Sequence, residues 1–204
     1  MSSRTRTAAA VGVVLMLGVA AVLALARGGA GHDSTPSSNV APPATASGLS
    51  QAADAAPALN NTGEDYEAIY RSLDAFSNWV FQHPDPALVD RYALPSCSCY
   101  RHDRDSLAAL AKQQRHLDGP GGRLTQVVLR RVAFRDTAGQ ATTVLLYVVS
   151  EGLDVNVVDS AGRSIQHIGS QPGFGFLDAL YRDTDGRWRI GQRDRLGPPG
   201  DTSR

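Results

Sequence analysis

The sequence has no excess of charge of either sign: 20 Lys and Arg residues balance 20 Asp and Glu residues, so the formal net charge is zero. A domain that binds nucleic acid through phosphate contacts normally carries a basic excess or a basic stripe. The local arginines at positions 123, 130, 131 and 135 fall on alternate faces of a predicted strand, which splits them. We therefore expect no nucleic-acid partner.

Cysteine is also scarce, with two residues in the whole chain and no C-x-x-C motif, so no thioredoxin-like redox pattern is present. No cysteine follows the N-terminal apolar run, which excludes the usual lipoprotein route. The glycine-rich segments 119–122 and 173–175 lack the Lys and Ser/Thr of a Walker loop, so they do not predict phosphate binding. We expect no cofactor.

The Cys97-Ser98-Cys99 motif permits three interpretations. Cα atoms two residues apart lie roughly 5.5–7 Å from each other, so a local disulfide is possible, and we favour this structural role. A redox-active pair is the second interpretation. A metal site made by the two thiolates with His102, and perhaps with His116, is the third, but this ligand set is incomplete and the two histidines would lie about 21 Å apart on one straight helix. We expect no metal.

Residues 8–26 form an uncharged apolar run that is long enough for a transmembrane helix, which needs roughly 17–25 residues. Arg4 and Arg6 precede the run, so the N-terminus is expected in the cytoplasm and the remainder outside. The pattern predicts a single-pass protein of the cell membrane with an extracytoplasmic domain. The alternative is a signal peptide cleaved after Ala26, in which case the domain is secreted.

The rest of the chain divides by composition into three parts. Residues 27–64 are rich in Ala, Ser and Pro and bury too little apolar surface to fold, so they predict a flexible tether. Residues 65–194 predict one folded domain, and residues 195–204 a disordered tail. The first 26 residues are the cytoplasmic stub and the span.

The domain begins with three helical segments and continues with short strands. Apolar residues at three- and four-residue steps predict a helix over 65–81, and shorter patterns predict helices over 86–92 and 103–117. Alternating apolar residues and glycine-containing turns then predict six strands, over 123–135, 141–150, 153–158, 163–168, 174–181 and 187–193. The fold class is therefore α+β, with three helices packed on one face of a curved antiparallel meander.

This order of elements resembles the nuclear-transport-factor-two-like (cystatin-like) cone, in which a long helix lies in a curved antiparallel sheet. The segment Tyr181 to Ile190 is similar to the final hairpin of such cones, with Trp188 packed under the sheet. The span, the tether and the cone together resemble membrane-anchored actinobacterial Mce-associated proteins and type IV secretion scaffold proteins. That resemblance implies envelope protein partners. The hairpin over 153–168 is expected to protrude.

Asp178 is the strongest candidate for a catalytic residue, since some members of the cone superfamily use an Asp or His inside the cavity. It interrupts an apolar strand face, and a buried acid would have a raised pKa. His167 is the candidate partner. The alternative is that this strand face is the solvent side near a sheet edge, or that Asp178 forms an ion pair with an Arg. Five further residues are candidates for the lining of a pocket: Tyr70, Tyr147, Phe174, Phe176 and Trp188.

Three functions are compatible with these features. The first is a non-enzymatic, membrane-tethered accessory or assembly module that binds envelope proteins or a second copy of itself, which the absence of a paired catalytic set favours. The second is a small-molecule binding protein, or an isomerase or dehydratase, that works through Asp178. The third is a redox or metal-binding role for Cys97 and Cys99.

Overall fold

A computed structural model describes residues 55–198 of the chain. Within this range the chain forms three helices and seven strands: α2 (Tyr66–Gln82), η2 (Pro86–Arg91), α3 (Ser98–Lys112), β1 (Arg115–Asp118), β2 (Gly122–Arg135), β3 (Ala141–Gly152), β4 (Val155–Asp159), β5 (Ser164–Ile168), β6 (Gln171–Arg182) and β7 (Trp188–Gly197). None of the described helices is long and apolar enough to cross a membrane. The predicted span at 8–26 lies outside the described residues, as do residues 199–204 of the predicted tail. The tail was predicted to begin at 195, but residues 195–197 belong to β7.

Helix α2 agrees with its prediction to within one residue at each end. The Asp65 carboxylate accepts a hydrogen bond from the Ala68 amide at 3.0 Å and so caps the first turn. The helix ends at His83, because Pro84 cannot donate a backbone hydrogen bond and restricts the residue before it. One stripe of α2 is buried, as its apolar spacing predicts: Tyr66, Ile69, Tyr70, Leu73, Phe76 and Val80.

The other two helical predictions need correction. The segment predicted over 86–92 is a short 3-10 helix, η2, in which the Ala87 amide donates a hydrogen bond to the Asp85 carboxylate at 2.9 Å. The helix predicted over 103–117 is displaced towards the N-terminus: α3 begins after Cys97 and ends before Gln114, whose φ of 52° is left-handed. Residues 115–117, which the sequence pattern assigned to this helix, belong to β1 instead.

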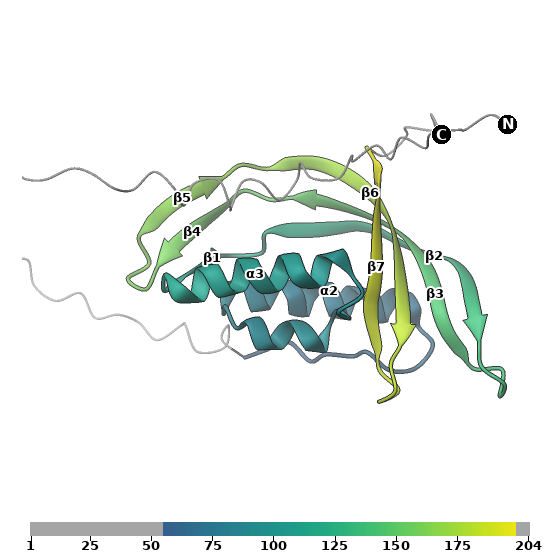
Figure 1. Cartoon of the computed structure of the whole chain (residues 1–204). Coiled ribbons are helices and arrows are strands. Elements are labelled where there is room, and N and C mark those ends of the chain that lie inside the picture. The colour runs from purple at the N-terminus through teal and green to yellow at the C-terminus, as the bar shows by residue number, and fades with distance from the viewer. Residues whose placement is uncertain (1–54, 199–204) are drawn as a thin grey trace, which may run out of the picture. The chain divides into compact units, whose positions relative to one another are not determined.

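The strands are arranged in two antiparallel sheets, one of four strands in the order β2-β3-β6-β7 and one of three in the order β1-β4-β5. The larger sheet is curved, and all three helices lie on its concave side (Figure 1). The α+β class and the packing of the helices on one sheet face are thus confirmed. The single six-stranded meander is wrong, because β1 adds a strand that pairs with β4 and so forms a second sheet. The hairpin expected to protrude over 153–168 corresponds to β4 and β5, which pair with β1 in the smaller sheet.

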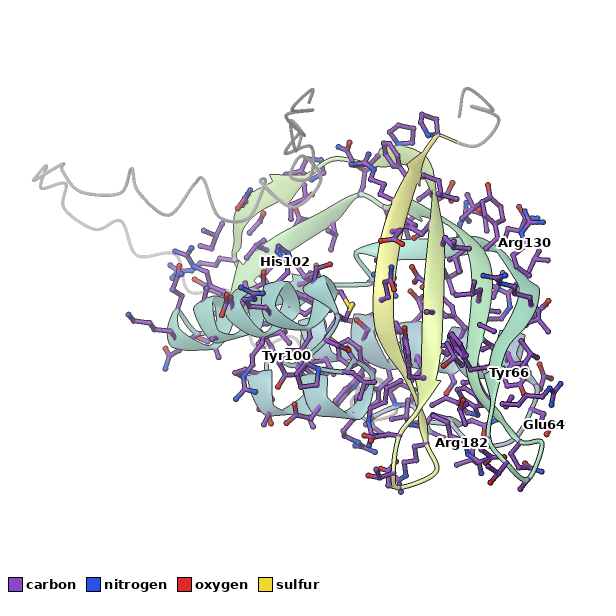
Figure 2. All side chains as sticks on the ribbon, turned by 45° about the vertical axis from the view of Figure 1, so that its right-hand side comes forward. Glu64, Tyr66, Tyr100, His102, Arg130 and Arg182 are labelled. Carbon is purple, nitrogen blue, oxygen red and sulfur yellow. A yellow bond between two sulfur atoms is a disulfide. The ribbon has the colours of Figure 1, made fainter. Side chains whose placement is uncertain are left out.

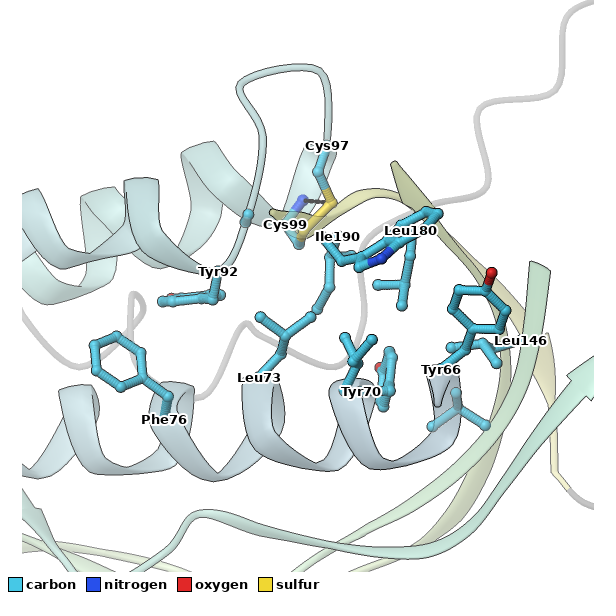
Figure 3. Close-up of a cluster of buried hydrophobic side chains, with 14 of the residues drawn as sticks. Tyr66, Tyr70, Leu73, Phe76, Tyr92, Cys97, Cys99, Leu146, Leu180 and Ile190 are labelled. Carbon is cyan, nitrogen blue, oxygen red and sulfur yellow. Dashed lines mark hydrogen bonds between the residues drawn. A yellow bond between two sulfur atoms is a disulfide. The ribbon is translucent and has the colours of Figure 1, made fainter. Parts of the chain in front are cut away.

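The core lies between the concave sheet face and α2. Tyr70, Leu73 and Phe76 point from α2 towards Leu180 and Ile190 of the sheet and towards the Cys97–Cys99 loop (Figure 3). Each large apolar side chain buried in this way stabilises the fold by roughly 1.5–3 kcal/mol. The alternate residues of β3 are fully buried for the same reason, since they face the helices: Val144, Leu146 and Val148.

Trp188 fixes the start of β7 to the chain before α2. Its ring packs edge-on against Tyr66, with centroids 5.2 Å apart, and its indole nitrogen donates to the Gly63 carbonyl at 2.9 Å. The Trp188 amide donates to the Asn61 carbonyl at 2.8 Å, and Asn61 is buried. The last residues of the segment 27–64, which composition assigned to the tether, therefore pack against the sheet.

Candidate functional site

The most polar part of the interior is a cluster of three side chains from three elements. Asp178 of β6 lies on the concave face and has no exposed surface. Tyr70 of α2 donates a hydrogen bond from its hydroxyl to the Asp178 carboxylate. Arg193 of β7 donates to the same carboxylate from Nη2 at 2.9 Å and from Nε at 3.0 Å, and Nη2 also donates to the Tyr70 hydroxyl at 2.8 Å. Each member of the cluster therefore contacts the other two.

A bulge in β7 brings Arg193 to this position. Leu180 pairs with Ile190, but the register then shifts by one residue, so that Asp178 pairs with Arg193 and not with Gln192. A bulge of this kind places an extra residue in one strand and redirects the side chains that follow it. The extra residue is Gly191. Two-residue alternation counted from the Asp-Gly turn does not place Arg193 opposite Asp178. A glycine inside a strand often marks a bulge, so Gly191 is the sequence feature that could have indicated this pairing.

Gly191 is required at the bulge because the ring of Tyr181 lies directly against its backbone. A Cβ atom at this position would come within 2.2 Å of the Tyr181 Cδ2 atom, which is far closer than carbon atoms approach in proteins. The sequence thus encodes the Asp178–Arg193 pair in part through a glycine two residues before Arg193.

Two more acidic side chains, those of Asp103 and Asp74, interact electrostatically with Arg193. Asp103 of α3 is buried and accepts a hydrogen bond from the Tyr92 hydroxyl at 2.9 Å. Asp74 of α2 accepts a hydrogen bond from the Asn78 amide at 3.1 Å. Burial raises the pKa of Asp74 to about 6 and also raises the pKa of Asp103, while the positive charge of Arg193 opposes both shifts.

These neighbours keep the side chain of Arg193 positively charged. Burial alone would lower the pKa of Arg193, but the charge and hydrogen bonds of the Asp178 carboxylate keep this pKa well above its usual value. Burial also raises the pKa of Tyr70 well above that of an exposed tyrosine, so this hydroxyl keeps its proton. The arrangement is therefore a carboxylate with both of its oxygen atoms bonded to donors of its own protein.

A general base must reach a proton of the substrate within hydrogen-bonding distance, directly or through one water. Asp178 has no exposed surface, and its donors come from Tyr70 and Arg193. Asp178 was expected to be an acid inside a pocket. The observed geometry instead matches the alternative, in which Asp178 forms an ion pair with an Arg. The cluster joins α2 to β6 and β7.

The structure does not bring His167 to Asp178. His167 lies on β5 in the smaller sheet, and its side chain is 63% exposed. Its nearest polar neighbours are the Asp154 carboxylate at 3.6 Å and the Asn156 side-chain oxygen at 3.4 Å. Two-residue alternation shows which face of its own strand His167 occupies, but it does not relate a strand of one sheet to a strand of the other.

The five residues expected to line a pocket lie in different environments. Tyr70 and Trp188 are buried in the interior. Phe174 and Phe176 are half-buried, beneath the guanidinium groups of Arg195 and Arg193, at 3.8 and 5.5 Å from the ring centroids. Tyr147, which pairs with Leu177 between the buried positions of β3, points to the opposite, convex face of the sheet.

A small surface hollow of about 60 Å³ lies at the end of the sheet where β6 and β7 are joined (Figure 2). Since one water needs at least about 10–15 Å³, this hollow holds a few waters at most. Asp178 is not among the residues that line it, which are Gly63, Glu64, Tyr66, Gln140, Ala141, Arg182 and Trp188.

Cys97 and Cys99 form a disulfide at the start of α3, as the structural interpretation of the motif predicts. Among residues 55–198 no group of three or more His, Cys, Asp or Glu side chains is placed to hold a metal ion. His102 lies on α3, where its Nε2 atom is 3.4 Å from the Ser106 hydroxyl, while His116 lies on β1. The oxidised cysteines provide no thiolate for the metal site considered above.

No family model and no curated protein matches this chain. Among solved structures, it is similar to the intermembrane-space region of the chloroplast protein ARC6, with 14% identity over 65% of this chain and 94% of that one and a TM-score of 0.46. It is also similar to Aln2 from a Streptomyces species, with 12% identity over 67% and 93% of the two chains and a TM-score of 0.40.

A third similar structure is a nuclear transport factor 2-like superfamily protein from Salmonella enterica, with 12% identity over 61% of this chain and 84% of that one and a TM-score of 0.35. All three TM-scores are below one half, so the description of the fold rests on the strand register and the helix packing. The resemblance to Mce-associated and type IV secretion proteins stays a prediction.

Proposed function

We propose that the chain is a non-catalytic, membrane-tethered accessory module whose domain binds protein partners on the extracytoplasmic side of the membrane. The observation that carries this proposal is that both oxygen atoms of the Asp178 carboxylate already accept hydrogen bonds within the chain. The best candidate for a catalytic acid or base is fully buried and bonded to Tyr70 and Arg193. Such a group can stabilise a fold but has no position from which to act on a substrate.

An isomerase or dehydratase that worked through Asp178 would need a cavity beside the carboxylate and a free oxygen atom on it. The carboxylate instead pairs with Arg193, and the side chains next to it along β6 and β3 are the fully buried Leu180 and Leu146. Opening a cavity there would require the partly exposed Arg193 to leave the fully buried Asp178 carboxylate, and leaving a buried charge without its partner costs about 3–5 kcal/mol. This cost makes a ground state with a pocket unfavourable.

The location outside the cytoplasm is supported by two features of the chain. The apolar run at 8–26 is long enough to cross a membrane, and Arg4 and Arg6 on its N-terminal side favour a cytoplasmic N-terminus. A Cys97–Cys99 disulfide fits the same side of the membrane, because disulfides persist in oxidising compartments.

The test is affinity purification of the tagged full-length chain in mild detergent, after brief cross-linking in cells that naturally express it. The matched control keeps residues 1–54 but carries an unrelated folded domain of similar size in place of the rest. We expect envelope proteins to be enriched with the authentic domain over the control. Equal recovery from both chains in several mild detergents would contradict the proposal, since the domain would then bind none of the recovered proteins.

A further inference from the structure

The hairpin formed by β2 and β3 carries an excess of positive charge. Its strands and turn contain four arginines and two acidic residues, Asp136 and Glu151. Glu151 forms an ion pair with Arg123 at the end of the hairpin opposite to the turn. The Asp136 carboxylate accepts hydrogen bonds from the amides of Ala138 and Gln140 inside the turn. Since the whole chain has no net charge, the excess is a local property of this hairpin.

The other three arginines, at positions 130, 131 and 135, are exposed and form no ion pair within residues 55–198. Arg130 lies over the ring of Tyr147 at 4.8 Å, on the outer side of the sheet (Figure 2). Arg135 donates a hydrogen bond to the Gly139 carbonyl at 2.8 Å, which does not neutralise its charge. Three positive charges near the turn are therefore available to a partner.

One acidic residue of α2 also contacts this strand. Glu67 accepts a hydrogen bond from the Leu129 amide at 3.2 Å. Leu129 pairs with Leu146, whose side chain is buried on the concave face. Glu67 thus bonds to the backbone from the helix side and forms no ion pair with the arginines of the outer side.

An exposed aromatic side chain lies among these arginines. Phe134 is 66% exposed, more than any other large apolar side chain that is exposed in the described residues. It pairs with Thr143, and Arg131 pairs with Leu145, two β3 residues that alternate onto the same face as Tyr147. The ring and its basic neighbours thus project from one face of a hairpin whose turn extends beyond the helices (Figure 1).

We propose that the turn end of the β2–β3 hairpin binds an anionic lipid surface, with Phe134 in the interfacial region and the three arginines at the headgroups. Interfacial segments bind in this way, by burying Phe, Trp or Leu and by the attraction of Lys and Arg to anionic lipids. The span predicted at 8–26 would hold the domain beside a bilayer, so the inference rests on the proposed function. It adds a fixed orientation of the domain on the membrane.

A weak contact is sufficient when the domain is tethered. Each arginine near an anionic surface strengthens binding by about fivefold, so three together contribute about a hundredfold. Residues 27–54 separate the predicted span from the described domain, and a flexible chain of that length has an end-to-end distance of roughly 30 Å. Short flexible tethers give effective concentrations in the millimolar range. The contact is therefore populated in the anchored chain even where a free domain would dissociate.

An acidic protein is the alternative occupant of this surface. A protein interface of standard size takes roughly 800 Å² of accessible surface from each partner, with complementary shapes. The end of the hairpin presents one ring and three long side chains, which is a small and protruding surface. A lipid headgroup layer requires no matching shape, so the observations favour lipid.

The contact is tested with the full-length chain in lipid nanodiscs made of phosphatidylcholine, with or without one third of phosphatidylglycerol. A nitroxide spin label on Phe134→Cys reports its surroundings, since Cys97 and Cys99 are joined and the sequence has no other cysteine. In the anionic discs we expect more collisions of the label with oxygen, and fewer with a water-soluble nickel complex, than in the neutral discs. A label on Ile165→Cys, which is 46% exposed on β5 in the other sheet, is the control and should stay in water in both.

The role of charge is tested with the same label. Arg130→Glu combined with Arg131→Glu should lower the lipid-bound fraction by about tenfold or more, and high salt should act in the same direction. Arg101→Glu combined with Lys112→Glu changes the net charge equally at exposed positions of α3 and should have no such effect.

Three results would overturn the proposal. The first is a label at position 134 that stays in water in anionic discs, as an exclusively protein partner requires. The second is equal immersion of this label in both kinds of disc, or immersion that the double reversal does not change. The third is equal immersion of the labels at positions 134 and 165.

The lipid contact and the proposed function can fail separately. An anchored chain whose label at position 134 stays in water would overturn the lipid contact and leave the accessory role standing. A label that enters the lipid, in a chain that enriches no envelope protein over the control, would do the reverse.

Discussion

The two faces of strand β6 differ sharply although they are made by adjacent residues. Asp178 points to the concave side and has all of its interactions within the chain, with Tyr70 and Arg193. Leu177 points to the convex side and is partly exposed, and it lies in register with Tyr147 of β3 and with the exposed Asp194 of β7. The two faces thus use charge differently: the carboxylate of Asp178 is buried and paired with Arg193, whereas the carboxylate of Asp194 is exposed.

The largest effect should come from removing the cation of the inner face. Arg193→Met leaves the Asp178 carboxylate buried without its positive partner, which should lower the free energy of unfolding by about 3–5 kcal/mol. Urea unfolding of the solubilised chain measures this loss. Arg195→Met is the matched control, since Arg195 also covers a phenylalanine of β6 but is exposed and has no carboxylate partner in the described residues. Equal stability of the two variants would show that the inner cluster is not structural.

The next largest effect should come from the bulge that positions Arg193. Gly191→Ala places a Cβ atom against the Tyr181 ring, so the ring or the strand must move. We expect a loss of about 1–3 kcal/mol in the free energy of unfolding, as is usual for overpacking. Gly169→Ala is the control, because its nearest neighbour, Asp154 Oδ1, is 3.9 Å away. If thermal denaturation shows equal midpoints for both variants, the close contact with Tyr181 is not what requires glycine.

The hydroxyl of Tyr70 should contribute less than Arg193 does. Tyr70→Phe removes one donor from Asp178 but leaves the ion pair intact, so we expect a loss of about 1–3 kcal/mol. Tyr147→Phe on the convex face should change stability by no more than about 0.5 kcal/mol, as is usual for a surface substitution. Chemical denaturation of both variants under one set of conditions compares the two faces directly. Equal losses in the free energy of unfolding would show that the hydroxyl on the concave face stabilises the fold no more than the one on the convex face.

The sequence predicts the elements of this fold better than it predicts the site. Regular apolar spacing locates α2 and the strands, because one face of each element is buried and the pattern records it. The predicted end of α3 was wrong because no Gly or Pro marks it in the sequence. Gln114 instead adopts the left-handed conformation that stops the helix. The partner of Asp178 was not identified because its position depends on a one-residue bulge, and strand register beyond a bulge follows from packing at Gly191 rather than from alternation.

The smallest predicted effect concerns the pH dependence of stability. Burial raises the pKa of Asp74 to about 6 in the folded protein, above its unfolded value of about 3.9. The folded state therefore binds more protons than the unfolded state between about pH 4 and 6, and stability from this group is present at low pH and is lost as the pH rises. Asp103, whose pKa is also raised by burial, acts in the same direction.

Asp74→Asn removes this pH-dependent loss, so the variant should gain stability relative to the wild type by about 1–3 kcal/mol as the pH rises from 4 to 7. Asn78→Ala provides the matched comparison. The Asn78 amide donates to the Asp74 carboxylate and lowers its pKa, so its removal should move the loss of stability to higher pH. Urea unfolding at pH 4, 5, 6 and 7 measures both effects. A constant difference between Asp74→Asn and the wild type across this range would mean that Asp74 is solvated in the folded state, and that the charged inner cluster ends at Asp178, Tyr70, Arg193 and Asp103.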